Sequence, residues 1–107
     1  MHQKNIILSA KCAPQFKKLT AIKKAGITAV ELYLSKYILS NTKEIIKVCR
    51  KFPFNYAVHG SNDSYEPLKL RKIAQAINAK LIVLHDIYWE DEWKEVVRIF
   101  KKVKASI

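Results

Sequence analysis

The sequence is poor in the residues that dominate disordered, fibrous and disulfide-stabilised proteins. It has two glycines and three prolines in 107 residues, whereas half of its residues are apolar. This composition excludes collagen-like and low-complexity chains and predicts a folded domain. The only cysteines, Cys12 and Cys49, are far apart and form no CxxC pair, so neither a disulfide framework nor a zinc ribbon is indicated.

Long apolar runs and acidic side chains are also scarce. No run approaches the roughly 20 apolar residues of a membrane-spanning helix, and the amino end has no signal-peptide pattern. We therefore expect a cytoplasmic protein that does not enter a membrane. Nine acidic side chains stand against 20 lysines and arginines, which leaves a net charge of +11. This excess favours phosphates, nucleic acid or another anion as a partner, although most lysines fall on the expected solvent faces of helices.

Strand and helix patterns alternate strictly along the chain. The expected strands span residues 5–10, 29–34, 55–59 and 80–85. The expected helices span residues 15–25, 41–52, 66–77 and 91–103. Each helical segment carries apolar residues at helical spacing. Gly26 ends the first helix, Asn41 with Glu44 forms a capping-box pattern, and Asp91 can cap the last helix.

This alternation predicts the α/β class, with four βα units of about 25 residues in a single domain over residues 1–107. Strands joined through helices run parallel, and a parallel sheet is buried on both faces, which fits the continuous runs Ile6–Leu8 and Leu81–Leu84. An open sheet with helices on both faces and a barrel wall with helices on one face both fit the pattern.

The length favours half of a TIM-type (βα)8 barrel. Eight units at this repeat would need about 200 residues, roughly twice the length of this chain. A half-barrel leaves one sheet face and two edges bare. We therefore expect a homo-oligomer, in which a second copy covers them, or a missing second half.

Two of the expected strands end in histidine. His59 ends the third strand and His85 the fourth, 26 residues later, and the carboxyl ends of barrel strands open at one mouth. Neighbouring strands lie about 4.8 Å apart, so imidazoles at matching depth can hold one divalent metal, zinc, manganese or magnesium, at about 2.1 Å. The alternative is that each histidine is an ordinary polar residue at a strand end.

Three charged residues complete the candidate site. Glu31 lies between the apolar residues Val30 and Leu32, where burying a carboxylate is costly unless a cation or a donor meets it. It is the candidate catalytic residue, or else the partner of a lysine at the strand end. Lys11 and Lys36 follow the first and second expected strands and could bind a substrate phosphate, or could simply be exposed.

The order of these segments resembles the first half of a known barrel superfamily. Val30–Leu32, Val58–Ser61 and Ala79–His85 together look like the second, third and fourth units of the xylose-isomerase-like TIM barrels. That superfamily includes sugar and sugar-phosphate isomerases and epimerases and the endonuclease IV type of repair enzyme. The stretch His59–Tyr65 also resembles the loop after the third strand in endonuclease IV relatives.

The resemblance implies that His59 and His85 are metal ligands and that Glu31 lies at the mouth. It implies a metal-dependent sugar or sugar-phosphate isomerase or epimerase, acting on a small polyol or phosphorylated substrate, with Glu31 binding a hydroxyl or moving a proton. The family takes further ligands from its later strands. We therefore expect either that a second subunit completes such a site or that the chain is a remnant or fragment without activity.

Two other functions stay open from the sequence. One is an endonuclease IV-like DNA-repair or nucleic-acid-binding protein, in which Tyr65, Tyr88 and Trp89 stack on a base rather than cover the core. Four acidic residues in the segment 86–92 count against it, because they repel phosphates. The other is a non-catalytic half-barrel with a structural role in assembly.

Overall fold

The computed structural model describes residues 6–61, 64–90 and 93–101, and in them it has a four-stranded parallel sheet. The strands are β1 (Ser9–Cys12), β2 (Ala29–Tyr33), β3 (Asn55–His59) and β4 (Leu81–Val83), paired in the order β1-β2-β3-β4. The predicted α/β class and the all-parallel sheet are therefore confirmed.

Six helices connect or follow these strands within the described segments. They are α1 (Phe16–Lys24), α2 (Lys36–Leu39), α3 (Thr42–Cys49), α4 (Pro67–Ala76), α5 (Asp86–Trp89) and α6 (Trp93–Phe100). Each strand is followed by at least one helix, which is the expected arrangement of four βα units. The single-turn helices α2 and α5 were not expected, because four residues are too few to produce a helical repeat of apolar positions.

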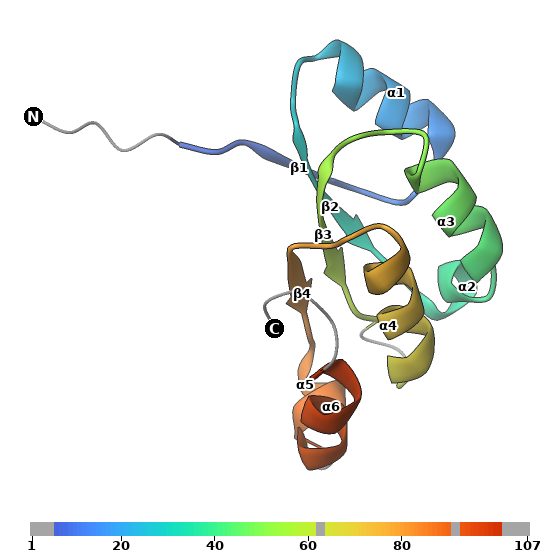
Figure 1. Cartoon of the computed structure of the whole chain (residues 1–107), viewed down its shortest axis with the longest axis vertical. Helices are drawn as coiled ribbons and strands as arrows, with labels where there is room; N and C mark the ends of the chain where they lie inside the picture. Colours follow the sequence, from blue (N-terminus) through green and yellow to red (C-terminus); the bar gives the residue numbers. More distant parts are fainter. Residues whose placement is uncertain (1–5, 62–63, 91–92, 102–107) are drawn as a thin grey trace, which may run out of the picture.

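The first strand lies later in the chain than the sequence predicted. Pairing with β2 begins at Ser9, opposite Ala29, and the apolar run before it is not part of the sheet. Ile6, Ile7 and Leu8 are 89%, 80% and 70% exposed, and this segment extends away from the sheet (Figure 1). The prediction of a buried strand over residues 5–10 was therefore wrong for Ile6–Leu8, because an apolar run shows a need for burial but does not supply the pairing partner. Ser9 and Ala10 do belong to β1, and Asn5 lies outside the described residues.

Two other local expectations also need correction. Asn41 precedes α3, but its side chain makes no capping hydrogen bond, since its backbone (φ −112°, ψ 45°) is not in the extended conformation of a typical cap. The fourth strand ends at Val83, and His85 instead precedes α5 as its cap residue. Asp91, the expected cap of the last helix, lies outside the described residues.

The helices cover one face of the sheet. Consecutive parallel strands joined by crossovers of one hand place every helix on the same side, and Figure 1 shows α1, α3 and α4 together on that side. In the view along the shortest dimension of the molecule, 22 Å, the sheet and the helix layer lie side by side (Figure 1). This is the layering of a barrel wall rather than of a sheet wound on both faces. The half-barrel itself stays a prediction.

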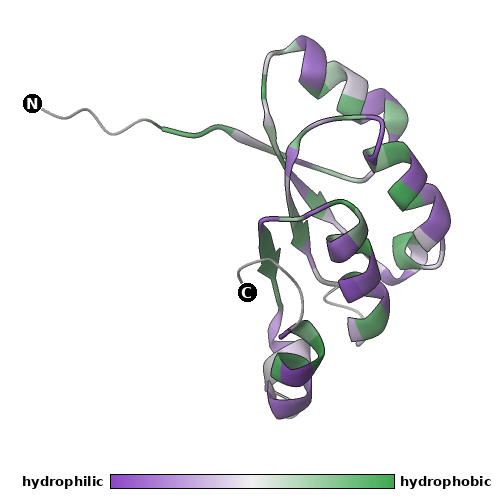
Figure 2. Cartoon of the chain, viewed as in Figure 1, coloured by the Kyte–Doolittle hydropathy of each residue, from purple (hydrophilic) through white to green (hydrophobic). Residues whose placement is uncertain are grey.

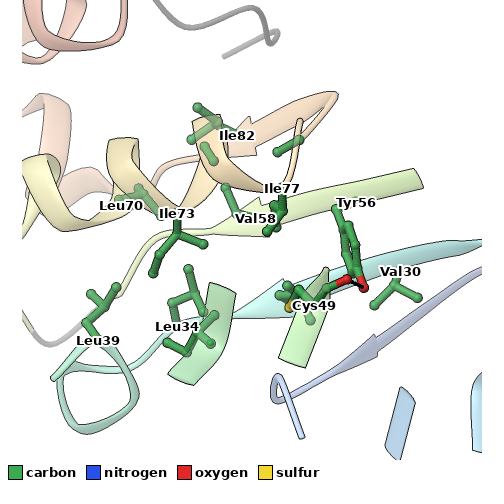
Figure 3. Close-up of a cluster of buried hydrophobic side chains, with 14 of the residues drawn as sticks. Val30, Leu34, Leu39, Cys49, Tyr56, Val58, Leu70, Ile73, Ile77 and Ile82 are labelled. Carbon is green, nitrogen blue, oxygen red and sulfur yellow. Dashed lines mark hydrogen bonds between the residues drawn. The ribbon is translucent and has the colours of Figure 1, made fainter. Parts of the chain in front are cut away.

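The core lies between the sheet and this helix layer. Val30, Leu32, Val58 and Ile82 are at most 1% exposed, and Figure 3 shows strand and helix side chains packed together there. Cys49 of α3 belongs to the same cluster. Figure 2 shows the corresponding pattern, with apolar strands and helices that are polar along part of their surface.

Within residues 6–61, 64–90 and 93–101, no helix covers the opposite face of the sheet. Because side chains alternate along a strand, the residues between the buried ones point to this side. Glu31, Ala57 and Val83 are half-buried there, and Leu81 and Tyr33 are exposed. We call this surface the open face.

Candidate functional site

The strand register arranges the candidate residues in rows across the open face. Lys11 on β1 lies opposite Glu31 on β2. The next row towards the carboxyl ends contains Tyr33 on β2, His59 on β3 and Val83 on β4. His85 follows Val83 by two residues, so it lies one row beyond His59.

The two histidines meet at this end of the sheet. His85 Nε2 lies 3.1 Å from His59 Nδ1, and the ring centroids are 4.3 Å apart with the ring planes at 83°. At this distance one nitrogen donates a hydrogen bond to the other, and the direction depends on the tautomers. The two imidazoles therefore converge as the sequence predicted, although His85 reaches His59 from the cap of α5 and not from the strand.

The same separation fits two ligands of one metal ion. Two nitrogens that are each about 2.1 Å from a zinc ion lie roughly 3 to 3.4 Å apart. Glu31 is not part of that arrangement, because its Oε1 lies 3.9 Å from Nε2 of His59, the ring nitrogen that does not face His85. Among the residues described, no group of three or more histidine, cysteine, aspartate or glutamate side chains is placed to hold a metal ion.

Several charges and the partial burial of His59 set its protonation. Burial, the neighbouring His85 and the Lys11 ammonium lower the pKa of His59 below its ordinary value of 6.5, and the Glu31 carboxylate only partly opposes them. His59 is therefore neutral at pH 7. The neutral imidazole is the form that can ligate a metal or accept a proton.

A pocket of about 300 Å³ surrounds the histidine pair. Its volume is at the lower end of the range for small-molecule sites, which suits a small substrate. Its lining residues are Lys11, Tyr33, Leu34, Ser35, His59, Gly60, Ser61 and His85.

Gly60 allows the neighbouring chain segments to approach closely beneath this pocket. A Cβ at this position would lie 3.1 Å from Leu70 Cδ2 and 3.2 Å from Tyr88 Cε1. Both of those side chains are fully buried, so they have little room to move. A glycine directly after His59 thus lets β3 continue over the core without displacing α4 and α5.

The structure separates the two lysines that were predicted to bind a phosphate. Lys11 is in β1, on the open face, and lines the pocket, whereas it had been expected in a loop. Lys36 is the first residue of α2 and is not among the residues that line it. Only Lys11 is therefore placed to meet a ligand beside His59.

Glu31 avoids the burial that its apolar neighbours suggested. Val30 and Leu32 are fully buried against the helices, but Glu31 points to the open face, where 30% of its side chain is exposed. It consequently keeps part of its hydration and does not need an interior cation. Its position opposite Lys11 and near His59 keeps it in the candidate site.

Three polar pocket residues were missed in the sequence. Tyr33 lies in the row of His59, and Ser35 and Ser61 follow that row by two residues, as His85 does. Their common position two residues after the row of His59 could have identified Ser35 and Ser61 as pocket residues. That inference requires the strand register, which the sequence alone does not give.

The aromatic residues proposed to stack on a base are not gathered at the pocket. Tyr88 is fully buried, and its hydroxyl accepts a hydrogen bond from the Glu66 backbone N–H at 3.2 Å, so it is unavailable to a ligand. The Tyr65 hydroxyl lies 3.0 Å from Glu95 Oε1. The side chain of Trp89 lies outside the described residues.

Comparisons with known proteins leave the site to be interpreted from its own geometry. The chain matches no family model, no curated protein and no solved structure. None of the helices in the described segments is long and apolar enough to cross a membrane.

Proposed function

We propose that this chain forms half of a metal-dependent sugar or sugar-phosphate isomerase or epimerase of the xylose-isomerase-like type. The observation that supports this most is the 3.1 Å approach of the His59 and His85 imidazoles inside a small pocket. Two converging imidazoles just beyond the carboxyl ends of adjacent parallel strands are suited to bind a metal where barrel enzymes bind their substrates.

In this proposal the residues that line the pocket and Glu31, which lies beside His59 on the open face, have separate roles. Glu31 takes the proton from the hydroxyl-bearing carbon beside the substrate carbonyl and returns it to the former carbonyl carbon, while the hydroxyl proton moves to the former carbonyl oxygen. Lys11 binds a substrate phosphate or hydroxyl. His59 and His85 would hold a divalent metal, which polarises the carbonyl and hydroxyl oxygens of the substrate. Tyr33 and Ser35 line the same pocket and can position hydroxyl groups.

The site requires more ligands than one chain supplies. Catalytic zinc usually has three protein ligands and a water, whereas this pocket offers two imidazoles. A second subunit that completes the ring of strands would bring its own histidine pair to the mouth. A homodimer is therefore part of the proposal.

Metal content tests the proposal without any assumption about the substrate. We expect the purified chain to retain zinc or manganese after gel filtration, and His59→Ala and His85→Ala each to lower the metal bound per chain at least about tenfold. His2→Ala, at the only other histidine in the sequence, is the matched control and should leave the amount of metal bound per chain unchanged. Metal retained by both His59→Ala and His85→Ala would refute the proposal.

A second candidate function, nucleic-acid binding of the endonuclease IV kind, is favoured by the charge on two adjacent helices. Residues 1–53 carry 11 basic and two acidic side chains, and the ring of Phe16 in α1 lies 5.5 Å from the ring of Phe52, which follows α3. Binding to abasic and intact duplexes at several salt concentrations separates the two functions. A salt-sensitive affinity that is weakened by changing Lys17 and Lys47 but not Lys11 would favour nucleic acid. If metal, sugar phosphates and DNA all fail to bind, the assembly role remains.

A further inference from the structure

The free edge of β4 borders an apolar groove. The groove has a volume of about 370 Å³ and lies between residues 81–84 and one side of α6. Leu81, Trp93 and Val97 are 42%, 53% and 52% exposed there. A helix that follows a strand in a barrel also packs against the next strand, and no described element occupies that position.

The opposite edge of the sheet offers a segment of matching character. Ile6–Leu8 lies directly before β1 and is the most exposed apolar run among the described residues. It extends out from the sheet in line with the first strand (Figure 1). Each end of the sheet thus leaves apolar surface in water that the other end could cover.

We infer that a second copy of this chain occupies the groove, with its Ile6–Leu8 segment paired in parallel along β4. This inference rests on the half-barrel of the proposed function and names the contact that closes it. Two copies with four consecutive parallel strands each give the eight strands of a closed barrel, with every helix outside. A two-fold axis along the barrel then makes both junctions identical.

The geometry of such a barrel also fixes which residues meet. An eight-stranded barrel of this kind has a shear of about eight residues, so each half shifts the register by about four. With strands tilted in the right-handed sense, the shift runs towards the amino end. The row that passes through Lys11, Glu31, Ala57 and Leu81 consequently continues to Ile7 of the partner subunit instead of to a second Lys11.

This register explains why the segment is apolar on both sides. The partner's Ile7 would lie beside Leu81 on the open face, which becomes the barrel interior. The partner's Ile6 and the partner's Leu8 would point the other way, under α6 and into the groove lined by Trp93 and Val97. A strand buried on both faces is continuously apolar, as this run is.

Charge supports the same pairing. Residues 11–18, which begin at the carboxyl end of β1, contain three lysines and no acidic residue, whereas residues 86–90, after β4, contain two acidic residues and no basic one. In the closed barrel these two segments of different copies follow neighbouring strands at the same end of the barrel. Their opposite charges therefore favour this pairing, although α6 itself carries Lys94, Glu95 and Arg98 and adds no negative charge.

The oligomeric state tests the inference. We expect the full chain to have twice the mass of one chain by light scattering and to dissociate on dilution. Leu8→Lys and Val97→Lys, on the two sides of the junction, should each weaken the dimer at least about tenfold. Leu68→Lys, at an exposed leucine of α4, makes the same change away from both edges and should leave the mass unchanged. Leu8 lies outside every helix and strand, so its variant should also keep the circular dichroism of the folded chain.

Cross-linking tests the register. The double variant Ile7→Cys with Leu81→Cys should form covalent dimers under oxidation, because residues opposite each other on paired strands lie within disulfide reach. The double variant Lys11→Cys with Leu81→Cys would be cross-linked only if the strands paired without the register shift. We therefore expect it to form no covalent dimers. Covalent products longer than dimers would overturn closure and indicate an open filament.

The two proposals fail differently. A wild-type monomer at every concentration, or a dimer that neither edge variant weakens, would overturn this inference whatever the chain does with metal. A closed dimer that binds no metal would leave the inference standing and remove the proposed activity.

Discussion

His59 lies on the sheet face that carries no helix, and the groups around it act directly on its imidazole. Burial and the positive neighbour Lys11 disfavour the protonated ring, so its pKa in the folded chain is below 6.5, the ordinary value that it regains on unfolding. The unfolded chain then binds more protons as the pH falls below 6.5. The free energy of unfolding therefore decreases as the pH falls below 6.5. The decrease is complete once the pH is below the pKa of His59 in the folded chain.

We therefore predict that His59→Gln reduces the acid sensitivity of the fold. The free energy of unfolding in urea, measured above and below pH 6.5, should fall less steeply with acid in the variant than in the wild type, because glutamine does not titrate. The two proteins are compared by how steeply the free energy of unfolding changes with pH. An effect of the substitution that is the same at every pH therefore does not alter the result. Parallel curves for the two proteins would show that the surroundings of His59 do not oppose its protonation.

Single residues of the candidate site were predictable to different degrees. The convergence of His59 and His85 followed from a strand-end spacing of one repeat, and it is present. The distinction between Lys11 and Lys36 could not be predicted, since it depends on where β1 ends and α2 begins. The orientation of Glu31 follows from the alternation along β2, but only once the helices are known to cover one face.

At the scale of elements, Tyr56 connects a strand to a helix end. Its hydroxyl donates a hydrogen bond to the Cys49 carbonyl at 3.0 Å, shown in Figure 3, and lies 3.5 Å from the Phe52 carbonyl. The last carbonyls of a helix have no partner within the helix, so this side chain satisfies part of the end of α3. Burial, the nearby Cys49 and the hydrogen bond to it raise the pKa of Tyr56, which therefore remains a donor at any ordinary pH.

Tyr56→Phe should destabilise the chain by about 1 to 2 kcal/mol, because it removes a buried donor and leaves its acceptors in the core. Urea denaturation should show a lower midpoint with an unchanged m-value. Tyr33→Phe is the matched control: its side chain is 38% exposed on the open face, and we expect an effect within about 0.5 kcal/mol. Equal effects of the two substitutions would show that the link between β3 and α3 contributes nothing.

The central elements were predicted more accurately than the edges. The expected strands 29–34 and 55–59 agree with β2 and β3 almost residue for residue, because each has neighbours on both sides and one fully buried face. The outer strands β1 and β4 differ more from expectation, since an edge strand extends only as far as its single partner. The apolar residues of a segment indicate that it tends to be buried, whereas hydrogen bonding to a neighbouring strand determines where the strand begins and ends.

At the scale of the whole molecule, the one-sided helix layer connects fold and function. It covers one face of the sheet and leaves the other, with Glu31 and His59, open to whatever completes the structure. The alternating pattern of the sequence predicted the order of units, and its length favoured the half-barrel, which stays a prediction. It could not place the bare edge of β4 beside an apolar groove, because that groove combines residues of β4 and α6 that only the fold brings together.

The charge of the molecule gives a prediction at this scale. The positive side chains behind a net charge of +11 on 107 residues repel one another in the compact state. Raising sodium chloride from low to about 0.5 M should therefore stabilise the chain by up to about 1 kcal/mol in urea unfolding, since salt screens this repulsion. Lys23→Glu on the exposed side of α1 lowers the net charge and should reduce the gain. A stability that falls with salt would instead mean that attraction between opposite charges, such as those proposed at the dimer junctions, outweighs the repulsion.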